Sequence, residues 1–166
     1  ARARIAFIGG LSNAEAQMKE LPAELQNDPG LMYDRLKWRY ARDKSDAVFD
    51  LVPKGIVPGP RPDLWWRQRS DLVRDALGRG RITEAYSIAK NHGATDSTNV
   101  ADAEFLAGWI ALRFLKDGET ALPHFQKIYD ISVTPPYLAR GAYWTGRAAE
   151  HLGRKDIADS WYQRAA

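Results

Sequence analysis

The 166-residue sequence contains no cysteine, which excludes a disulfide, a catalytic thiol and a thiolate metal site. This absence leaves the compartment open, because many exported proteins also lack cysteine. A long apolar run is missing as well. The most apolar stretch, AEFLAGWIALRFL at 103–115, is shorter than the roughly 18 to 20 residues that a membrane-spanning helix needs. Strict alternation of polar and apolar residues, the sign of β-strands, is nearly absent.

The sequence also has little excess charge. The net charge is +3, and the basic excess lies in residues 1–92. Residues 61–81 carry six arginines, no lysine and three aspartates. Such a segment suits an anionic partner, but a solvated helix face with intrahelical ion pairs is the more ordinary interpretation. No nucleic-acid-binding motif is present, so nucleic-acid binding is the weakest functional hypothesis, and no nucleic-acid partner is expected.

Helical periodicity dominates the chain. Apolar residues recur at intervals of three and four along most of it, which predicts an all-α protein. The expected helices cover 3–13, 14–26, 30–43, 45–52, 63–78, 81–92, 101–116, 118–130, 135–152 and 154–166. The proline-rich sequence VPKGIVPGPRP at 52–62 predicts an extended linker, because proline lacks a backbone donor and clashes with a preceding helical turn. A polar loop is expected at 91–102.

Turn-forming residues separate the expected helices. Asp28-Pro29-Gly30 is expected to end one helix and start the next, and Thr134 precedes prolines that fit a first helical turn. Left-handed helix caps are expected at four glycines: Gly78, Gly80, Gly118 and Gly153.

An internal repeat is the strongest structural signal. The segments that begin at Gly108 and Gly146 align at four positions: Gly108 with Gly146, Ala111 with Ala149, Ala121 with Ala158, and Phe125 with Tyr162. Matching alanines recur at Ala16, Ala47, Ala85, Ala121 and Ala158. The sequence spacing of these alanines is typical of helix-turn-helix repeats of the tetratricopeptide kind. The prediction is an α-solenoid, a right-handed superhelix of tetratricopeptide-like hairpins, with hairpins in 1–52, a linker at 53–62 and a block at 63–166 that form one continuous solenoid.

From the linker onward the chain resembles a known family. The segments DLWWRQRSDLVRDAL, EAYSIAKNHG, AEFLAGWIALRFL, ALPHFQKIY, ARGAYWTGRAAEHLG and WYQRAA follow one another in the order and spacing of the soluble lytic murein transglycosylases. They are similar to the superhelical region that precedes the catalytic domain of those enzymes. The earlier sequence DPGLMYDRLKWRYARDKSDAVFDLVP resembles the same region more loosely.

The resemblance implies a periplasmic protein that acts on peptidoglycan. Family members cleave the β-1,4 bond between N-acetylmuramic acid and N-acetylglucosamine and leave a 1,6-anhydro product. Their catalytic glutamate opens a Glu-Ser motif, and no Glu-Ser pair occurs in this sequence. The chain is therefore expected to be a non-catalytic part of such an enzyme, since both ends also lie within helical patterns. Its expected partners are glycan strands and the catalytic domain of the same protein, with no membrane span.

Aromatic residues next to arginines are the candidate glycan-binding residues. An exposed indole or phenol ring can stack on a sugar face while an arginine binds a stem-peptide carboxylate. Two groups of residues have this composition: Trp65, Trp66, Arg67 and Arg69 in the first, and Arg140, Tyr143 and Arg147 in the second. Packing between helices remains the alternative for these aromatics. It is the favoured interpretation for Trp109 and Trp144.

The sequence gives little indication of acid–base catalysis or of metal binding. Asp102 and Glu104 precede an apolar helix and are interpreted as N-terminal capping residues. The three histidines, His92, His124 and His151, have no metal-ligand spacing, so neither a metal nor a cofactor is expected. The alternative functional hypothesis is a free-standing adaptor that binds a peptide or protein on the concave face of a solenoid.

Overall fold

The computed structural model describes residues 2–42, 49 and 62–166, and for residues 62–65 it describes the backbone alone. The described residues form ten helices and no β-strand, which confirms the all-α prediction. The chain divides into two compact units, Ala1–Trp65 and Trp66–Ala166. Ala47 lies outside the described residues, as do the predicted helix 45–52 apart from Phe49, which is helical, and the predicted linker apart from Pro62, which begins a helix. Within the described part, no helix is long and apolar enough to cross a bilayer.

The first unit contains four short helices. They are α1 (Arg2–Ile8), α2 (Ala14–Lys19), α3 (Ala23–Gln26) and α4 (Pro29–Tyr40). The single helix predicted at 14–26 is wrong. Pro22, with φ −52° and ψ 144°, separates α2 from α3 because it restricts the preceding residue and cannot continue a helical hydrogen-bond ladder. The predicted start of α4 is confirmed: Asp28 accepts a hydrogen bond from the Leu31 amide at 2.8 Å.

α1 packs on α2 and α4 around a small apolar core. Phe7 and Trp38 meet edge to face, with ring centroids 5.7 Å apart. Ala16, the predicted repeat position in this unit, is exposed, and Ala14 is buried instead. The repeat assignment at Ala16 is therefore wrong, because α2 spans only six residues and buries a different face.

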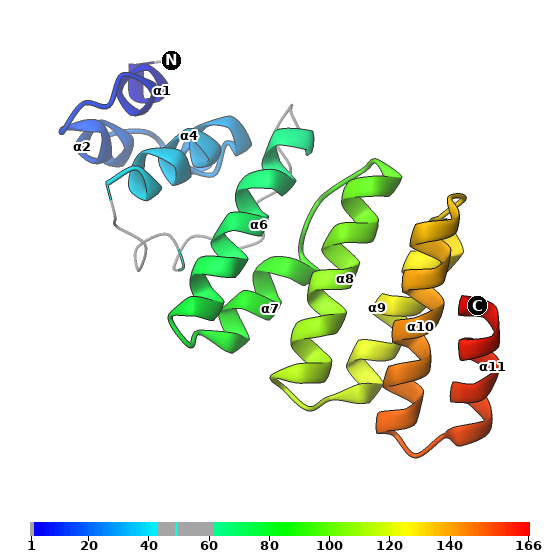
Figure 1. The fold of residues 1–166 in the computed structure, drawn as a ribbon. Coiled ribbons are helices and arrows are strands. Elements are labelled where there is room, and N and C mark those ends of the chain that lie inside the picture. The colour runs from blue at the N-terminus through cyan, green and yellow to red at the C-terminus, as the bar shows by residue number, and fades with distance from the viewer. Residues whose placement is uncertain (1, 43–48, 50–61) are drawn as a thin grey trace. The chain divides into compact units, whose positions relative to one another are not determined.

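The second unit follows the predicted helices closely (Figure 1). Its helices are α6 (Pro62–Gly78), α7 (Ile82–Lys90), α8 (Ser97–Arg113), α9 (Gly118–Ile131), α10 (Pro135–His151) and α11 (Lys155–Ala165). The largest difference is the start of α8, four residues earlier than predicted. Asp96 caps α8 by accepting from the Asn99 amide at 2.9 Å, so half of the predicted loop at 91–102 is helical.

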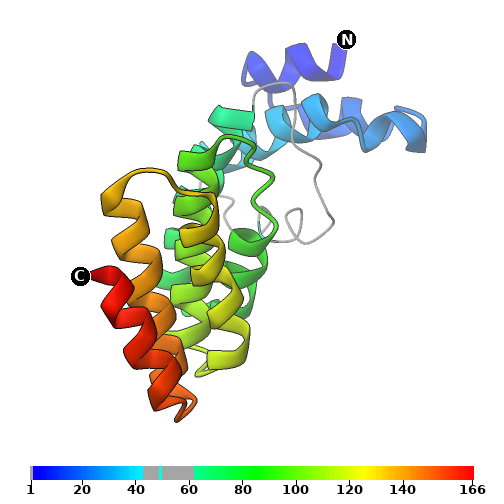
Figure 2. The ribbon, with the colours of Figure 1, turned by 90° about the vertical axis from the view of Figure 1, so that its right-hand side faces the viewer.

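Consecutive helices of this unit pack side by side as hairpins, as two perpendicular views show (Figures 1 and 2). α8 contacts α7, α9 and α10, which explains why residues 103–112 are apolar around most of the helix. Phe125 of α9 is fully buried, and its ring lies 5.5 Å from that of Trp144 on α10. Trp109 and Trp144 are partly buried against this core, as predicted.

Two hairpins of this unit share a matched contact at positions that align in the sequence. Gly108 on α8 faces the ring of Phe125 on α9, and a Cβ at Gly108 would lie 2.8 Å from that ring. Gly146 on α10 faces Tyr162 on α11 in the same way, with a distance of 2.6 Å. A glycine therefore lets each pair of helices approach closely. The repeat alanines Ala85, Ala121 and Ala158 are buried as well.

Two of the four predicted glycine caps are confirmed. Gly80 and Gly153 have φ values of 73° and 72°, which a residue with a Cβ rarely adopts. Gly78 and Gly118 were predicted wrongly, since Gly78 is the last residue of α6 and Gly118 is the first of α9. In the loop before α9, Lys116 takes the positive φ. Thr134 occupies the N-cap position of α10, but its hydroxyl makes no capping hydrogen bond there.

Candidate functional site

The first predicted group of glycan-binding residues is mostly buried. Trp66 is 4% exposed and packs edge to face on His92, and Arg69 is 1% exposed and donates from Nη2 to the Ile88 carbonyl at 3.3 Å. Burial lowers the pKa of Arg69 to about 10. Trp66 and Arg69 therefore hold α6 against α7 and its following loop, and their assignment to a sugar surface is wrong. Arg67 is exposed, and the side chain of Trp65 lies outside the described residues.

Arg140 of the second group has an intramolecular role. Its Nη2 donates to Asp102 Oδ1 at 2.8 Å, and its guanidinium lies over the rings of Phe105 and Tyr137, at 4.9 and 4.6 Å from the centroids. These contacts join α10 to α8. They also correct the interpretation of Asp102 as a helix cap, because α8 begins five residues earlier at Ser97.

The other two residues of the second group meet on an open surface. Arg147 donates from Nη1 to the Tyr143 hydroxyl at 3.3 Å, and its Nε lies 3.0 Å from Glu150 Oε2. From α11, the Tyr162 hydroxyl donates to the same Glu150 oxygen at 2.9 Å, and its ring lies 5.8 Å from that of Tyr143. These four side chains line an open cleft of about 610 Å³, termed the α10–α11 cleft.

Hydrogen bonding orders the charged groups of the α10–α11 cleft. The bond to Tyr143 is the main cause that raises the pKa of Arg147, so its positive charge is secure. Burial and the bond to the Glu150 carboxylate raise the pKa of Tyr162 to about 12, so this phenol stays protonated and keeps donating. Tyr143 is 42% exposed. The cleft thus presents an accessible aromatic ring beside a fixed guanidinium, which is the combination predicted for a sugar face next to a stem-peptide carboxylate.

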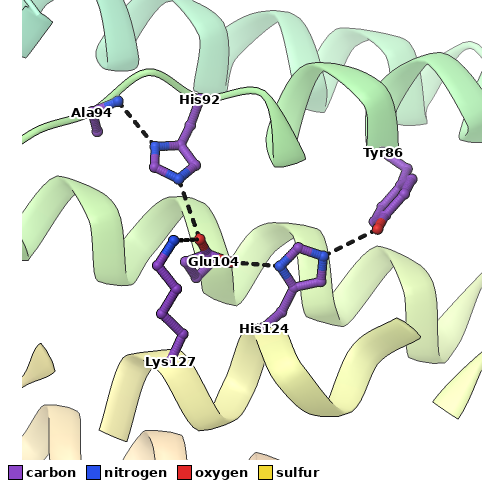
Figure 3. Close-up of polar contacts among 6 residues, drawn as sticks. All are labelled: Tyr86, His92, Ala94, Glu104, His124 and Lys127. Atoms are coloured by element: carbon purple, nitrogen blue, oxygen red, sulfur yellow. Dashed lines mark hydrogen bonds and ion pairs between the residues drawn. The ribbon is translucent and has the colours of Figure 1, made fainter. Parts of the chain in front are cut away.

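A second cluster, not predicted from the sequence, surrounds the buried carboxylate of Glu104 on α8 (Figure 3). Glu104 is 4% exposed. Its Oε1 receives Lys127 Nζ at 2.5 Å and faces His92 Nε2 at 3.3 Å, while its Oε2 lies 2.5 Å from His124 Nδ1. On the far side of His124, Nε2 lies 3.1 Å from the Tyr86 hydroxyl. The Glu104 cluster therefore ties α7 and its following loop to α8 and α9.

The hydrogen bonds of this cluster fix one histidine tautomer. His92 Nδ1 accepts from the Ala94 amide at 2.9 Å, so the ring proton is on Nε2 and points at Glu104. A nitrogen that carries a proton cannot ligate a metal, so His92 and Glu104 are unsuited to share one. Among the described residues, no three acidic, histidine or cysteine side chains have a geometry that could hold a metal ion.

The electrostatics of the Glu104 cluster favour the carboxylate. Burial acts to raise the pKa of Glu104, but the hydrogen bonds from His124, His92 and Lys127 together outweigh it and hold that pKa well below its usual range. Burial is the main cause that raises the pKa of Tyr86, which favours a protonated hydroxyl rather than a nucleophilic phenolate. The arrangement holds hydrogen bonds between side chains of three helices and the α7–α8 loop. It supplies no activated nucleophile.

The sequence contained a signal for this cluster that the capping interpretation missed. Glu104 is the one charged residue within the apolar 103–112, and a carboxylate in such a helix requires partners. Its partners come from positions 12, 20 and 23 residues away in the chain. Their convergence depends on how α7, α8 and α9 pack, which residue spacing alone does not reveal.

Comparisons with protein-family models, with curated proteins and with solved structures gave no significant match to this chain.

Proposed function

We propose that this chain is a non-catalytic helical segment of a periplasmic peptidoglycan lytic transglycosylase. In this proposal its hairpins form part of a right-handed, tetratricopeptide-like superhelix. The segment supports the catalytic domain of the same protein and guides glycan strands toward it. The parent enzyme would cleave the bond between N-acetylmuramic acid and N-acetylglucosamine, and the described residues would hold the polymer without reacting with it.

Two sequence features support the proposal. The apolar segment at 104–115 and the segment YWTGRAAE at 143–150 resemble the superhelical region of that family more specifically than they resemble general helical repeats. The first forms most of α8, and the second lies in α10. The matched glycine–aromatic contacts of the two hairpins are consistent with a repeating array.

The α10–α11 cleft is the observation that carries the proposal. Its exposed Tyr143 ring offers a stacking surface for a sugar, and Arg147 lies one helical turn away with its charge held in place. Peptidoglycan carries sugars and carboxylates at short intervals along one strand. A cleft that combines a ring with a guanidinium matches that alternation, whereas a purely apolar groove would favour a helical or extended peptide.

Retention on insoluble peptidoglycan sacculi tests this function. We expect the full chain to sediment with sacculi, and retention to fall as salt rises because part of the attraction is between charges. The double variant Tyr143→Ala, Arg147→Ala is expected to lose most of the retention. Tyr40→Ala is the matched control, since Tyr40 is 45% exposed and lies in the other unit. Equal retention of both variants would contradict the assignment of the cleft as the glycan-binding surface. If the unsubstituted chain is not retained, the proposed function is contradicted.

A further inference from the structure

A second cavity shares Arg147 and Glu150 with the α10–α11 cleft and is lined by residues from the C-terminal parts of α8 and α10 and from the loop after α8. It has a volume of about 260 Å³ and is termed the cation cavity. Leu112 and Trp144 form its apolar lining, and the Trp144 ring is held edge to face against Phe105, with centroids 5.6 Å apart. Pockets that enclose a whole small molecule are usually about 300 to 1,000 Å³. The cation cavity therefore fits one chemical group of a larger ligand.

Positive side chains dominate the rim of this cavity. Arg113, Lys116 and Arg147 line it, and Glu150 is the one carboxylate among its described lining residues. Glu150 is already bonded to Arg147 and to the Tyr162 hydroxyl. In the part of the chain that the structure describes, neither Arg113 nor Lys116 has an acidic side chain within ion-pair distance. Two cations are thus available to a ligand.

The loop that carries Lys116 has an unusual backbone conformation. Lys116 has a φ of 58°, in the left-handed region that residues with a Cβ seldom occupy. His151, on the opposite rim, donates from Nε2 to the Lys116 carbonyl at 3.2 Å and so fixes the loop to α10. The adjacent Asp117 accepts from the Thr120 amide at 2.9 Å and caps α9, so its charge is engaged elsewhere. Backbone strain of this kind is often concentrated at binding sites.

We propose that the cation cavity binds a carboxylate of the peptidoglycan strand. This inference rests on the proposed function, because it names the chemical group that the same surface recognises. The guanidinium of Arg113 offers paired donors that match a carboxylate, and Lys116 adds a second positive charge. The Trp144 indole lies beside them and accepts an apolar or ring-shaped part of the ligand next to the carboxylate.

The carboxylate has two sources on such a strand. One is the lactyl group of an N-acetylmuramic acid that carries no stem peptide, and the other is the stem peptide itself where one is attached. Three probes separate them. N-acetylmuramic acid has the sugar and the carboxylate, N-acetylglucosamine has a similar sugar without the carboxylate, and N-acetylalanine has a carboxylate without the sugar.

The test is a titration of the full chain with each probe, followed by NMR of the indole N–H of Trp144 and the side-chain N–H groups of Arg113. N-acetylmuramic acid is expected to shift both signals with an affinity that falls as salt rises, and N-acetylglucosamine is not. An additional response to N-acetylalanine identifies the peptide as a sufficient source. The same response to the two sugars would overturn the inference.

Two lysine variants, one at the cation cavity and one away from it, are compared as test and control. Lys116→Gln is expected to weaken binding of N-acetylmuramic acid by up to roughly fivefold, because an exposed ion pair contributes up to about 1 kcal/mol. Lys155→Gln removes an exposed lysine at the start of α11 and is expected to leave binding unchanged. If Lys116→Gln does not fold because of the backbone strain at this position, Arg113→Gln is used for the same test.

Sacculus retention separates this inference from the proposed function. If the chain is retained on sacculi but does not distinguish the two sugars, the function stands and the carboxylate site is wrong. If N-acetylmuramic acid binds but sacculi do not retain the chain, the carboxylate site stands and the proposed function is wrong.

Discussion

At the scale of single residues, the Glu104 carboxylate connects several segments of the second unit. A buried carboxylate is costly unless donors surround it, and here His92, His124 and Lys127 supply them from outside α8. The hydrogen bonds do more than neutralise a charge. Because they come from the α7–α8 loop and from α9, they join three consecutive segments through one carboxylate.

Glu104→Gln is expected to lower the free energy of unfolding by about 1–3 kcal/mol. The amide keeps one acceptor oxygen and places N–H groups where the other oxygen now accepts from His124 or from His92 and Lys127, so at least one of these hydrogen bonds is lost. The measurement is urea unfolding of the parent chain and the variant.

Glu119→Gln is the control for this substitution. Glu119 also pairs with an arginine, Arg154, but its side chain is 63% exposed. An exposed pair of this kind contributes less than about 1 kcal/mol. Equal losses in the two variants would contradict a special role for the Glu104 cluster.

The same carboxylate predicts a pH dependence of stability. The pKa of Glu104 in the folded chain lies below its ordinary value of 4.5. The unfolded chain therefore takes up this proton first as the pH falls, so the stabilisation by Glu104 is complete above about pH 4.5 and declines below it.

The measurement is the difference in unfolding free energy between the parent chain and Glu104→Gln, from about pH 7 to about pH 3.5. We expect the difference to narrow below about pH 4.5. A difference that stays constant over the whole range would contradict the depressed pKa.

At the scale of helices, the sequence predicted the helix bounds of the second unit well, because glycine and proline end or begin helices through their own backbone geometry. Gly153 and the Pro135-Pro136 pair end and begin helices for steric reasons that hold in any tertiary context. Predictions failed where tertiary contact decided the outcome. Gly118 resembles a cap in the sequence, but it is glycine because a Cβ would meet Leu152 at 2.9 Å.

The glycines of the matched hairpins give a prediction at this scale. Gly108→Ala is expected to destabilise the chain by about 1–3 kcal/mol, because its methyl group would overlap the fully buried ring of Phe125. Gly146→Ala is expected to cost less, since Tyr162 is partly exposed and its ring can shift.

Gly78→Ala is the matched control. A Cβ at this helical position has open space around it, so alanine is expected to be neutral or to stabilise by up to about 1 kcal/mol. Thermal unfolding followed by circular dichroism compares the three variants. A loss in Gly108→Ala as small as that in Gly78→Ala would show that the close approach of α8 and α9 is not required.

At the scale of the whole molecule, periodicity and composition were sufficient to predict the all-α class. They were insufficient to separate surface from core among arginines and tryptophans. Trp66 and Arg69 have the composition of a sugar site but are buried, whereas Tyr143 and Arg147 share an exposed face as their four-residue spacing predicted. The Glu104 cluster could not be predicted because its members meet only through the packing of separate helices.

The central claim is that this chain holds peptidoglycan on the surface of α10 and α11. The most direct test is NMR chemical-shift mapping of the full chain with soluble, uncross-linked peptidoglycan fragments. We predict shifts that cluster around Tyr143, Arg147 and Tyr162 and that disappear in the double variant Tyr143→Ala, Arg147→Ala. An absence of shifts, or shifts confined to residues of α1 to α4, would contradict the claim.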